Sequence, residues 1–540
     1  MKNIFKLIPG ALLAVILVAA CDTTALHNTN IDPNSVNQID MNYFFTAAEL
    51  GSASGGDRGD DRYIDWRTNI GMCAHGTQQM ATASTGLLCT GDKYIDNDME
   101  VNAAPFEFWL QGVGKECAEI LRQTGTGGFA EGKNLNMREA TRILRALNFH
   151  RLTDMYGSVP YSEGDKGIEG LFFPHYDKQQ AIYTDLFNEL DQATAALSAS
   201  NPDEGFANAD IIYEGDLTKW KKWGYSIMLR MAMRISNVDA ATAGTYVTKA
   251  VAGGVFSSND DNAIVPEAIG PSEWTNQNGI SRAFMPGDGG QAQLSFMGKT
   301  LVDFLKNNND PRLMIYCGGI GTMSAPGGIP QMNFFAGGNL PANQNGMPNG
   351  KDLQMFRALG VTNVDSAFSK INPLLIHDDS PYRLMSYAEV EFLMAEAIER
   401  GIGTVPGTAA THYNNGVKAA MQMWTIFNAS LAVSDADVAT YLAAHPYGGA
   451  TLNDRLELIG TQLWASHFMN WFEAWSEWRR SGHPALVAVT PPYPGNNTNG
   501  QIPTRLRYPL SEVSNNPNYK TDATVPDEID GKVWWAGGPE

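Results

Sequence analysis

Apolar side chains recur at helical spacing in several parts of the chain. The stripes are Ala140, Ile143, Leu144 and Leu147; Ile182, Leu186, Leu190, Ala193 and Leu197; Trp220, Trp223, Ile227 and Met231; Tyr413, Val417, Ala420, Met421 and Trp424; and Leu456, Ile459, Leu463, Trp464, His467, Trp471, Trp475 and Trp478. Residues at i, i+3, i+4 and i+7 share one face of a helix, so each stripe predicts an amphipathic helix. Asp216 stands at an N-cap position before the third stripe, and Gly482 and Pro484 end the last helix. Two-residue alternation, typical of half-buried strands, is hard to find, and we predict an all-α, mainly helical protein.

Two neighbouring helical segments, 385–400 and 411–425, are separated by the breaker-rich stretch 401–407 and predict a helical hairpin. Ala388 and Ala395 are small residues at the expected contact between the two helices. Paired helices of this kind suit a solenoid, in which each pair buries its apolar face against the next. Since no strict repeat period is visible, we expect any tetratricopeptide-like repeats to be degenerate.

The stretch from about 253 to 381 has a different composition from the helical parts. It is dense in Gly, Pro and Asn, as in 325–328 and 345–350. Long loops in a compact domain are usually functional or disordered. We therefore expect a helical scaffold, mainly 38–252 and 382–484, that carries a loop-rich region in its middle.

The N-terminal segment has the three-part layout of a secretory signal peptide. Lys2 and Lys6 precede an apolar run from 8 to 20, which ends at Cys21 in the pattern of a bacterial lipobox. The run is well short of the ~20 apolar residues that a membrane-spanning helix needs, which disfavours the alternative of an uncleaved anchor. We predict a signal peptide at 1–20, lipid on Cys21, a polar tether over 21–37 and one domain over 38–540.

The composition excludes some partners and leaves room for a large core. The chain has 540 residues, of which 43% are hydrophobic, and its formal net charge is −20. Removal of Lys2 and Lys6 with the signal peptide leaves 36 basic and 58 acidic residues, a charge of −22, which argues against nucleic acid as a partner. The four cysteines after Cys21 form no Cys-x-x-Cys pair, although Cys73 and Cys89 could form a disulfide in an oxidising envelope.

Common catalytic and cofactor motifs are absent from the sequence. No His-Glu-x-x-His helix and no Gly-x-Ser-x-Gly elbow occurs. Residues 298–300 imitate the end of a phosphate loop, but Gln293 stands in place of its leading glycine. Cys73, His75 and Cys89 match no common zinc spacing. We predict no catalytic residue, no metal and no cofactor.

Three carboxylates, Glu389, Glu391 and Glu396, crowd one predicted helix. A pair of carboxylates could hydrolyse glycosides, so a surface glycosidase or peptidase is the alternative function. Residues seven apart share a helix face, and we expect Glu389 and Glu396 to pair instead with arginines. The candidate partners are Arg230, Arg234, Arg479 and Arg480.

A series of short motifs in a fixed order resembles the SusD/RagB family of nutrient-binding outer-membrane lipoproteins. Each motif is weak by itself, and their order along the chain makes the set specific. The motifs occupy residues Leu152–Glu163, Tyr213–Trp220, Leu229–Ile235, Asn309–Arg312, Tyr387–Ala397, Trp475–Pro484 and Ile502–Pro509.

The resemblance implies a fold, a partner and a location. The fold would have four tetratricopeptide-like helix pairs and a loop-rich ligand-binding region at about 253–381. The protein would be a non-catalytic lid over a SusC-type TonB-dependent barrel transporter, on the outer membrane and facing the exterior. It would capture an oligosaccharide or an oligopeptide. One departure is that Asp22 is followed by Thr23 and Thr24, whereas surface export is thought to favour several acidic residues there.

The shared motifs suit the scaffold, so ligand contacts must be sought elsewhere. Aromatic rings bind the apolar faces of sugars while amides and carboxylates take the hydroxyls, and a peptide would use backbone hydrogen bonds. Aromatic residues outside clear helical periods and near Asn or Gln are our candidates; the alternative for each is that its ring packs a loop onto the scaffold. The candidates are Tyr94, Trp274, Phe284, Phe334 and Phe335.

Overall fold

The fold is described from a computed structural model of the chain. It covers residues 39–54, 62–86, 91–96, 99–203, 205–272, 275–287, 294–523 and 526–539. The predicted signal peptide, Cys21, Cys89 and Trp274 lie outside these residues. The chain divides into two units, Met1–Met41 and Asn42–Glu540, and apart from Met41, the first residue of α3, the description below concerns the second unit. Within the described ranges, no helix is both long enough and apolar enough to cross a membrane.

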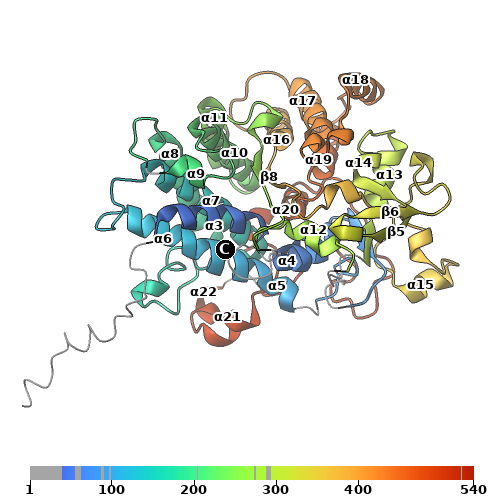
Figure 1. Cartoon of the computed structure of the whole chain (residues 1–540), viewed down its shortest axis with the longest axis horizontal. Helices are drawn as coiled ribbons and strands as arrows, with labels where there is room; N and C mark the ends of the chain where they lie inside the picture. Colours follow the sequence, from blue (N-terminus) through green and yellow to red (C-terminus); the bar gives the residue numbers. More distant parts are fainter. Residues whose placement is uncertain are drawn as a thin grey trace, which may run out of the picture. The chain divides into compact units, whose positions relative to one another are not determined.

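Paired helices form the scaffold, as the apolar stripes predict (Figure 1). α7 packs on α8, α10 on α11, and α16 on α17, while α10 contacts both α8 and α16 and so joins successive pairs. α16 also contacts α19, which is followed by α20. The main helices are α3 (Met41–Ser54), α6 (Lys115–Thr124), α7 (Leu135–Tyr156), α8 (Gln179–Ala196), α10 (Leu217–Ile235), α11 (Ala240–Gly253), α16 (Tyr387–Arg400), α17 (Ala409–Gln422), α18 (Asp435–Ala444), α19 (Leu452–Ser466) and α20 (Trp471–Ser481).

The predicted helix ends are confirmed at two places where a cap was expected. The Asp216 carboxylate accepts hydrogen bonds from the backbone N–H groups of Thr218 (2.9 Å) and Lys219 (3.2 Å). Gly482 ends α20 with a left-handed φ of 73°, a conformation that suits glycine. Ala388 and Ala395 are fully buried in the α16–α17 hairpin, which confirms the predicted pair.

The single helix predicted over 456–478 is wrong, because the chain breaks between α19 and α20. Met469 takes a left-handed φ of 72°, which a continuous helix does not allow. Arg383 reaches this break from a neighbouring strand and donates to the carbonyl oxygens of Ser466 (3.1 Å) and Phe468 (2.8 Å). A buried guanidinium thus satisfies carbonyl groups at the end of α19. The apolar residues on both sides of the break are still buried, among them Trp464, Trp471 and Trp475.

Short strands and helices occupy the region predicted as loops. The described residues form four two-stranded antiparallel sheets, and six of these eight strands lie within 253–381. Each strand has two to four residues, which is too short to show alternation in the sequence. The pairs are β1 (Met80–Thr82) with β3 (Ser295–Met297), β2 (Ala263–Val265) with β8 (Tyr382–Met385), β4 (Cys317–Gly319) with β7 (Lys370–Ile371), and β5 (Gly321–Ser324) with β6 (Gln331–Phe334). The helices of this region are α12 (Gly279–Phe284), α13 (Lys299–Asn307), α14 (Leu313–Tyr316) and α15 (Leu353–Ala358).

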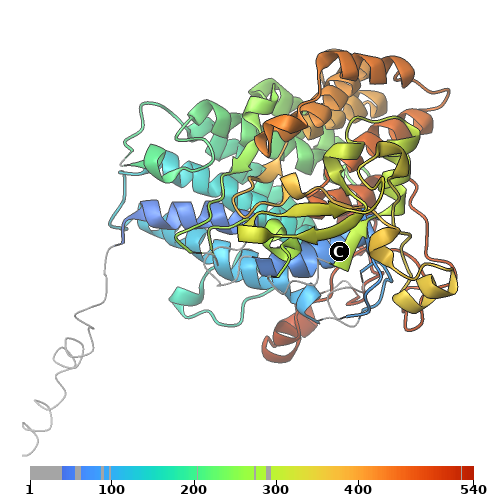
Figure 2. The same ribbon diagram turned by 45° about the vertical axis from the view of Figure 1, so that its right-hand side comes forward.

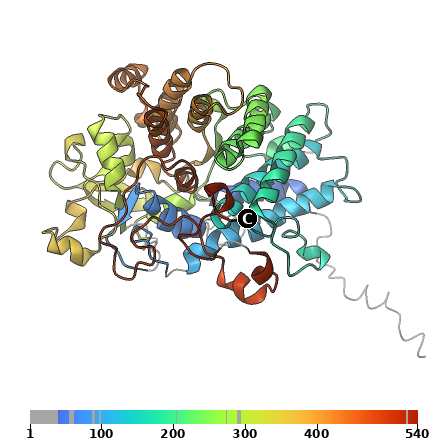
Figure 3. The same ribbon diagram turned by 180° about the vertical axis from the view of Figure 1, so that it is seen from behind.

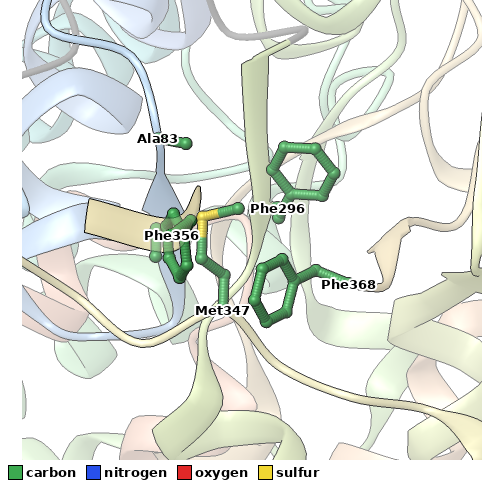
Figure 4. Packing of buried hydrophobic residues seen from close by; sticks show 6 residues of the cluster. Ala83, Phe296, Met347, Phe356 and Phe368 are labelled. Atoms are coloured by element: carbon green, nitrogen blue, oxygen red, sulfur yellow. The ribbon is translucent and has the colours of Figure 1, made fainter. Parts of the chain in front are cut away.

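A small hydrophobic core of its own holds the loop-rich region together (Figure 4). Phe296 comes from β3, Phe356 from α15, and Met347 and Phe368 from connecting segments. Their side chains point toward one another in Figure 4 and are buried together with Ala81 and Ala83. Segments far apart in sequence are therefore fixed by apolar packing, although they lack long helices or strands.

Candidate functional site

A groove of about 560 Å³ lies in the loop-rich region and is our candidate ligand site. Three segments supply most of its lining: the first turns of α13, the segment 348–351 that leads to α15, and the segment 487–492 that follows α20. The groove contains apolar and polar side chains together, the mixture typical of small-molecule sites. Its lining residues are Gln78, Lys299, Thr300, Asp303, Pro348, Asn349, Gly350, Lys351, Met355, Val487, Ala488, Val489, Thr490, Pro491 and Pro492.

One amide side chain, that of Gln78, ties the floor of the groove to two of its walls. Its Nε2 donates to the hydroxyl oxygen of Tyr94 (3.1 Å) and to the carbonyl oxygen of Val487 (2.5 Å). Its Oε1 accepts a hydrogen bond from the hydroxyl of Thr300 (2.8 Å). The position of the 487–492 wall relative to α13 is therefore set by this buried residue.

Gln78 at the floor and Tyr94 beneath it have backbone conformations that are unusual for residues other than glycine. Gln78 has a φ of 58° and Tyr94 a φ of 56°, and the two side chains are hydrogen-bonded to each other. Such strain costs on the order of 1–3 kcal/mol per residue and persists only where the surroundings impose it. Strained residues of this kind concentrate at functional sites, which supports the choice of this groove.

Two glycines allow the walls to approach as closely as they do. A Cβ on Gly298 would lie 2.2 Å from the carbonyl oxygen of Gln78, so the start of α13 can touch the floor only without a side chain there. A Cβ on Gly350, whose φ is 77°, would lie 2.3 Å from Cγ1 of Val489 on the opposite wall. The phosphate-loop likeness of 298–300 thus has a packing explanation, because Gly298 is required for backbone contact.

The rim of the groove carries charges that are held in place by short bonds. Lys299 and Asp303 form an exposed ion pair at 2.5 Å on α13. At the N-terminus of α15, the carboxylate of Asp352 accepts hydrogen bonds from the hydroxyl of Tyr493 (2.6 Å) and from the backbone N–H of Met355 (2.8 Å). Burial raises the pKa of Asp352, but these hydrogen bonds outweigh it and hold the pKa below its ordinary value. Asp352 therefore stays ionised and caps α15.

The predicted ligand residues fall into two groups in the structure. Tyr94 and Phe284 are buried, which is the position that the packing alternative expects for both rings. Burial also raises the pKa of the Tyr94 hydroxyl, which stays neutral. Phe334 is 50% exposed and Phe335 39% exposed, as a ligand contact requires. Trp274 lies outside the described residues.

Phe334 is half exposed and lies close to a glycine of a neighbouring strand. It lies on β6 of the β5–β6 hairpin, which comes forward in Figure 2. A Cβ on Gly319 would be 2.6 Å from Cε1 of Phe334, so one edge of the ring can lie this close only because residue 319 has no side chain. An exposed ring can stack on a sugar. Neither Phe334 nor Phe335 lines the groove, so the two features are separate candidates for ligand contact.

Sequence reasoning missed the residues that shape the groove. Gln78 and Thr300 carry no motif of their own, and Val487 follows the last long helix in a segment without periodicity. The one available signal is Gly298, which in the sequence forms part of an imitation phosphate loop. The positive φ of Gln78 results from tertiary contacts, so it cannot be predicted from the residue type.

The acidic residues of α16 form ion pairs in the scaffold, Glu389 and Glu396 with arginines and Glu391 with His412. Glu389 accepts from Nε (2.5 Å) and Nη2 (2.8 Å) of Arg230. Glu396 accepts from both terminal nitrogens of Arg480 (2.7 and 2.5 Å) and from Arg400 (2.7 Å). The predicted arginine pairing is confirmed for both carboxylates. Because they are buried and fully engaged in ion pairs, they do not form an accessible acid–base pair.

The sequence predicts no metal site and leaves a Cys73–Cys89 disulfide open. Cys73 is a buried free thiol whose pKa is raised by burial, while Cys89 lies outside the described residues. His75 is buried too, and its ring nitrogens lie 3.3 Å from the carbonyl oxygen of Gly71 and 3.0 Å from the hydroxyl of Ser295. In the part of the chain that the structure describes, no three His, Cys, Asp or Glu side chains are grouped so as to hold a metal ion.

Comparison with known families explains the combination of paired helices and a loop-built groove. Residues 34–509 match the family model for SusD-like proteins, described as starch-binding and associating with the outer membrane. The chain belongs to the SusD-like family. A solved structure described as a chitin-binding protein is 30% identical, with a TM-score of 0.75, and the match covers 92% of this chain and 100% of that one. The SusD-like resemblance and the helical fold class predicted from sequence are thereby confirmed.

Two other solved structures share the fold of this SusD-like protein at lower identity. A SusD-like protein described as Bacteroidetes AC2a is 24% identical, with a TM-score of 0.75 and coverage of 92% and 100%. A chitin-binding SusD homologue from Flavobacterium johnsoniae is 22% identical, with a TM-score of 0.73 and coverage of 92% and 99%. No curated protein matches the chain.

Proposed function

We propose that this SusD-like protein is a lipid-anchored nutrient-capture protein on the outside of the outer membrane. It binds an oligosaccharide and passes it to a SusC-type TonB-dependent transporter, over which it acts as a hinged lid. The observation that carries the proposal is the family match over residues 34–509, whose description combines starch binding with association with the outer membrane. Lipid on Cys21 and the tether over 21–37 would keep the domain close to the transporter and raise its effective concentration there.

Chitin oligosaccharides are the ligand class that the comparisons favour. The solved structure at 30% identity is described as a chitin-binding protein, and so is the Flavobacterium johnsoniae homologue. Val487, Val489 and Met355 give the groove apolar walls against which acetamido methyl groups and sugar-ring faces would lie. Lys351 and Asp303 would bind hydroxyl and amide groups at the rim.

A peptide ligand is a weaker fit to the groove. Extended peptides are usually bound by backbone hydrogen bonds along an open strand edge. None of the residues that line the groove belongs to a strand. The oligopeptide alternative therefore serves as the comparison ligand in the binding experiment.

Calorimetric titration of the purified protein with chitohexaose, maltohexaose and a peptide mixture tests the ligand class. We expect saturable binding of chitohexaose. Val487→Ser should weaken it about tenfold, since burying one valine side chain contributes about 1.5 kcal/mol. Leu359→Ser, on an exposed leucine outside the groove, is the matched control and should bind as the wild type does. Equal affinities for the valine variant and the wild type would exclude the groove as the binding site.

Purification from outer membranes in mild detergent tests delivery to a transporter. The wild-type protein should co-purify with a barrel-sized TonB-dependent protein, while Cys21→Ser should be lost from the membrane fraction. Recovery of the wild-type protein alone would contradict the lid mechanism. Release of sugars from chitohexaose, abolished by Glu389→Gln with the fold intact, would favour a glycosidase instead.

A further inference from the structure

Two polar side chains on one turn of the groove wall have atoms that are available to a ligand. Asn349 and Lys351 both line the groove, on either side of Gly350. In Figure 3 the loop-rich region (yellow) lies beside the segment that follows α20 (dark red), which carries Val489 on the opposite wall. A Cβ on Gly350 would lie 2.3 Å from Cγ1 of Val489, so the turn is packed against that wall. Its two polar side chains are therefore held at the groove.

The side-chain amide of Asn349 has one fixed orientation. Its Nδ2 donates to the carbonyl oxygens of His75 (2.9 Å) and Met80 (3.3 Å). Both hydrogens of the amide nitrogen are thereby used, and a flipped amide would place its oxygen against two carbonyl oxygens. In the described part of the chain Oδ1 accepts no hydrogen bond, and it is accessible from the groove. Asn349 therefore offers a ligand an acceptor and no donor.

The ammonium group of Lys351 is the second available group. Lys351 is partly buried and forms no ion pair within the described ranges. The other charged groups nearby are engaged. Lys299 is paired with Asp303 at 2.5 Å, and Asp352 accepts a hydrogen bond from Tyr493 at 2.6 Å. Because an ammonium group has three donors on a flexible stem, Lys351 offers a ligand donors and a positive charge.

An acceptor and a donor on neighbouring positions match a secondary amide. The N–H and C=O of such a group point in opposite directions, so it needs an acceptor on one side and a donor on the other. The fixed amide of Asn349 would accept from the N–H, and the flexible Lys351 would reach the carbonyl oxygen. The methyl group of an acetamide would lie against apolar side chains of the walls, Val489 and Met355.

Other groups at the same position of a sugar fit this pair less well. A hydroxyl group can bond to Asn349 or Lys351, but it has no methyl group to bury against the walls. A protonated amine can donate to Asn349, but it has no acceptor for Lys351 and is repelled by the ammonium charge. The pair therefore distinguishes an acetamido group from both alternatives.

We propose that Asn349 and Lys351 make the groove selective for N-acetylated sugar units over units with a hydroxyl or a protonated amine at the same position. The inference rests on the proposed capture of chitin oligosaccharides and deepens it by assigning the residues that recognise the acetamido group. Asn349 is the acceptor, and Lys351 is both the donor and the charge that excludes deacetylated units. Val487 gives apolar contact to any sugar ring and does not distinguish these ligands.

Three hexasaccharides with the same linkage, which differ in the group at carbon 2, test this selectivity. They are chitohexaose, cellohexaose and the fully deacetylated glucosamine hexamer, titrated in a calorimeter at a pH at which the amines are protonated. The wild type should bind chitohexaose at least about tenfold more tightly than either of the others, which is the effect of one hydrogen bond to a charged group. Equal affinities for chitohexaose and cellohexaose would overturn the inference.

Lys351→Met removes the donor and the charge but keeps the apolar stem of the side chain. Because Lys351 has no ion pair to lose, the variant should fold as the wild type does. Its affinity for chitohexaose should fall about tenfold, and its preference over the glucosamine hexamer should shrink to within about threefold. Lys351→Arg should restore the preference. The control is Lys520→Met, on an exposed lysine of α22 (Tyr519–Asp522) outside the groove, which should keep the wild-type affinities.

Asn349→Asp tests the acceptor with a side chain of the same shape. Its negative charge should shift the preference toward the glucosamine hexamer at least about tenfold. The variant also loses the hydrogen bonds to His75 and Met80, so its melting temperature is measured as well, and Lys351→Met decides if it does not fold.

The outcomes separate this inference from the proposed function. If the wild type binds chitohexaose and Val487→Ser weakens the binding, while Lys351→Met keeps the full preference for chitohexaose, the acetamido assignment is wrong and the proposed capture of chitin oligosaccharides stands. If the wild type binds none of the three hexasaccharides, both fail.

Discussion

Glu396 of α16 forms an ion pair with α20 inside the scaffold. Its replacement by glutamine tests whether this carboxylate has a structural role or a catalytic one. Its carboxylate accepts three hydrogen bonds from Arg480 and Arg400. Removing the charge leaves two guanidinium groups beside a neutral amide in a buried setting. Breaking a buried ion pair from one side costs about 3–5 kcal/mol. Because Arg480 keeps its second partner, Glu477, we expect Glu396→Gln to lower the free energy of unfolding by about 3 kcal/mol.

The pH dependence of this loss has a definite sign. Burial raises the pKa of Glu396, but the charges of Arg480 and Arg400 outweigh it and lower the pKa below that of the unfolded chain. A carboxylate with a lowered pKa stabilises the folded state above its unfolded pKa, about 4.3, and loses that contribution as the pH falls. The gap in stability between the wild type and Glu396→Gln should be constant between pH 6 and 8, within about 0.5 kcal/mol, and shrink below pH about 4.

Urea denaturation followed by tryptophan fluorescence measures the effect. Asp303→Asn is the control, because it removes an exposed ion pair whose loss should cost less than about 0.5 kcal/mol. The reasoning is refuted if Glu396→Gln is as stable as this control. A variant with wild-type stability that has also lost a hydrolytic activity would show that Glu396 is a catalytic residue after all.

Three further outcomes follow from the contacts of single residues. Burial raises the pKa of the Glu49 carboxyl well above its ordinary value. The stabilising contribution of this residue is therefore complete below pH about 4.3 and is lost as the pH rises. For this reason Glu49→Gln should raise the melting temperature more at pH 8 than at pH 5. Gly350→Ala should lower stability by about 1–3 kcal/mol and weaken chitohexaose binding, because its φ is left-handed and its Cβ would collide with Val489; unchanged affinity in calorimetry would contradict this. Asp216→Ala should cost about 1 kcal/mol in urea denaturation through the loss of the α10 cap, whereas Asp216→Asn should cost less.

The scaffold was predictable because its helices satisfy local and tertiary requirements with the same residues. Trp220 and Trp223 lie on one stripe of α10 and are buried, and Asp216 caps the helix that carries them. The break between α19 and α20 was not predictable, since the apolar stripe continues through it. It depends on Arg383, which is distant in sequence and supplies donors for the carbonyl groups that the break exposes.

The candidate site was less predictable, because exposure is decided by the fold. Phe284 and Phe334 both lie in segments without helical period, yet the first is buried in α12 and the second is half exposed on β6. Sequence could select aromatic rings as candidates but could not tell which rings face solvent. Tyr94 shows a third outcome, in which a buried ring supports Gln78 beneath the groove and has no contact with solvent.

The separate core of the loop-rich region supports one wall of the groove independently of the helical scaffold. Met347 and Phe356 are buried in the small cluster shown in Figure 4, and each directly adjoins a residue of the groove wall, Pro348 and Met355. The wall is thus held by apolar packing that is independent of the ion pairs of α16 and α20. Side chains on the open side of Pro348 and Met355 can change without touching either core, so ligand preference can shift while the helix pairs stay the same.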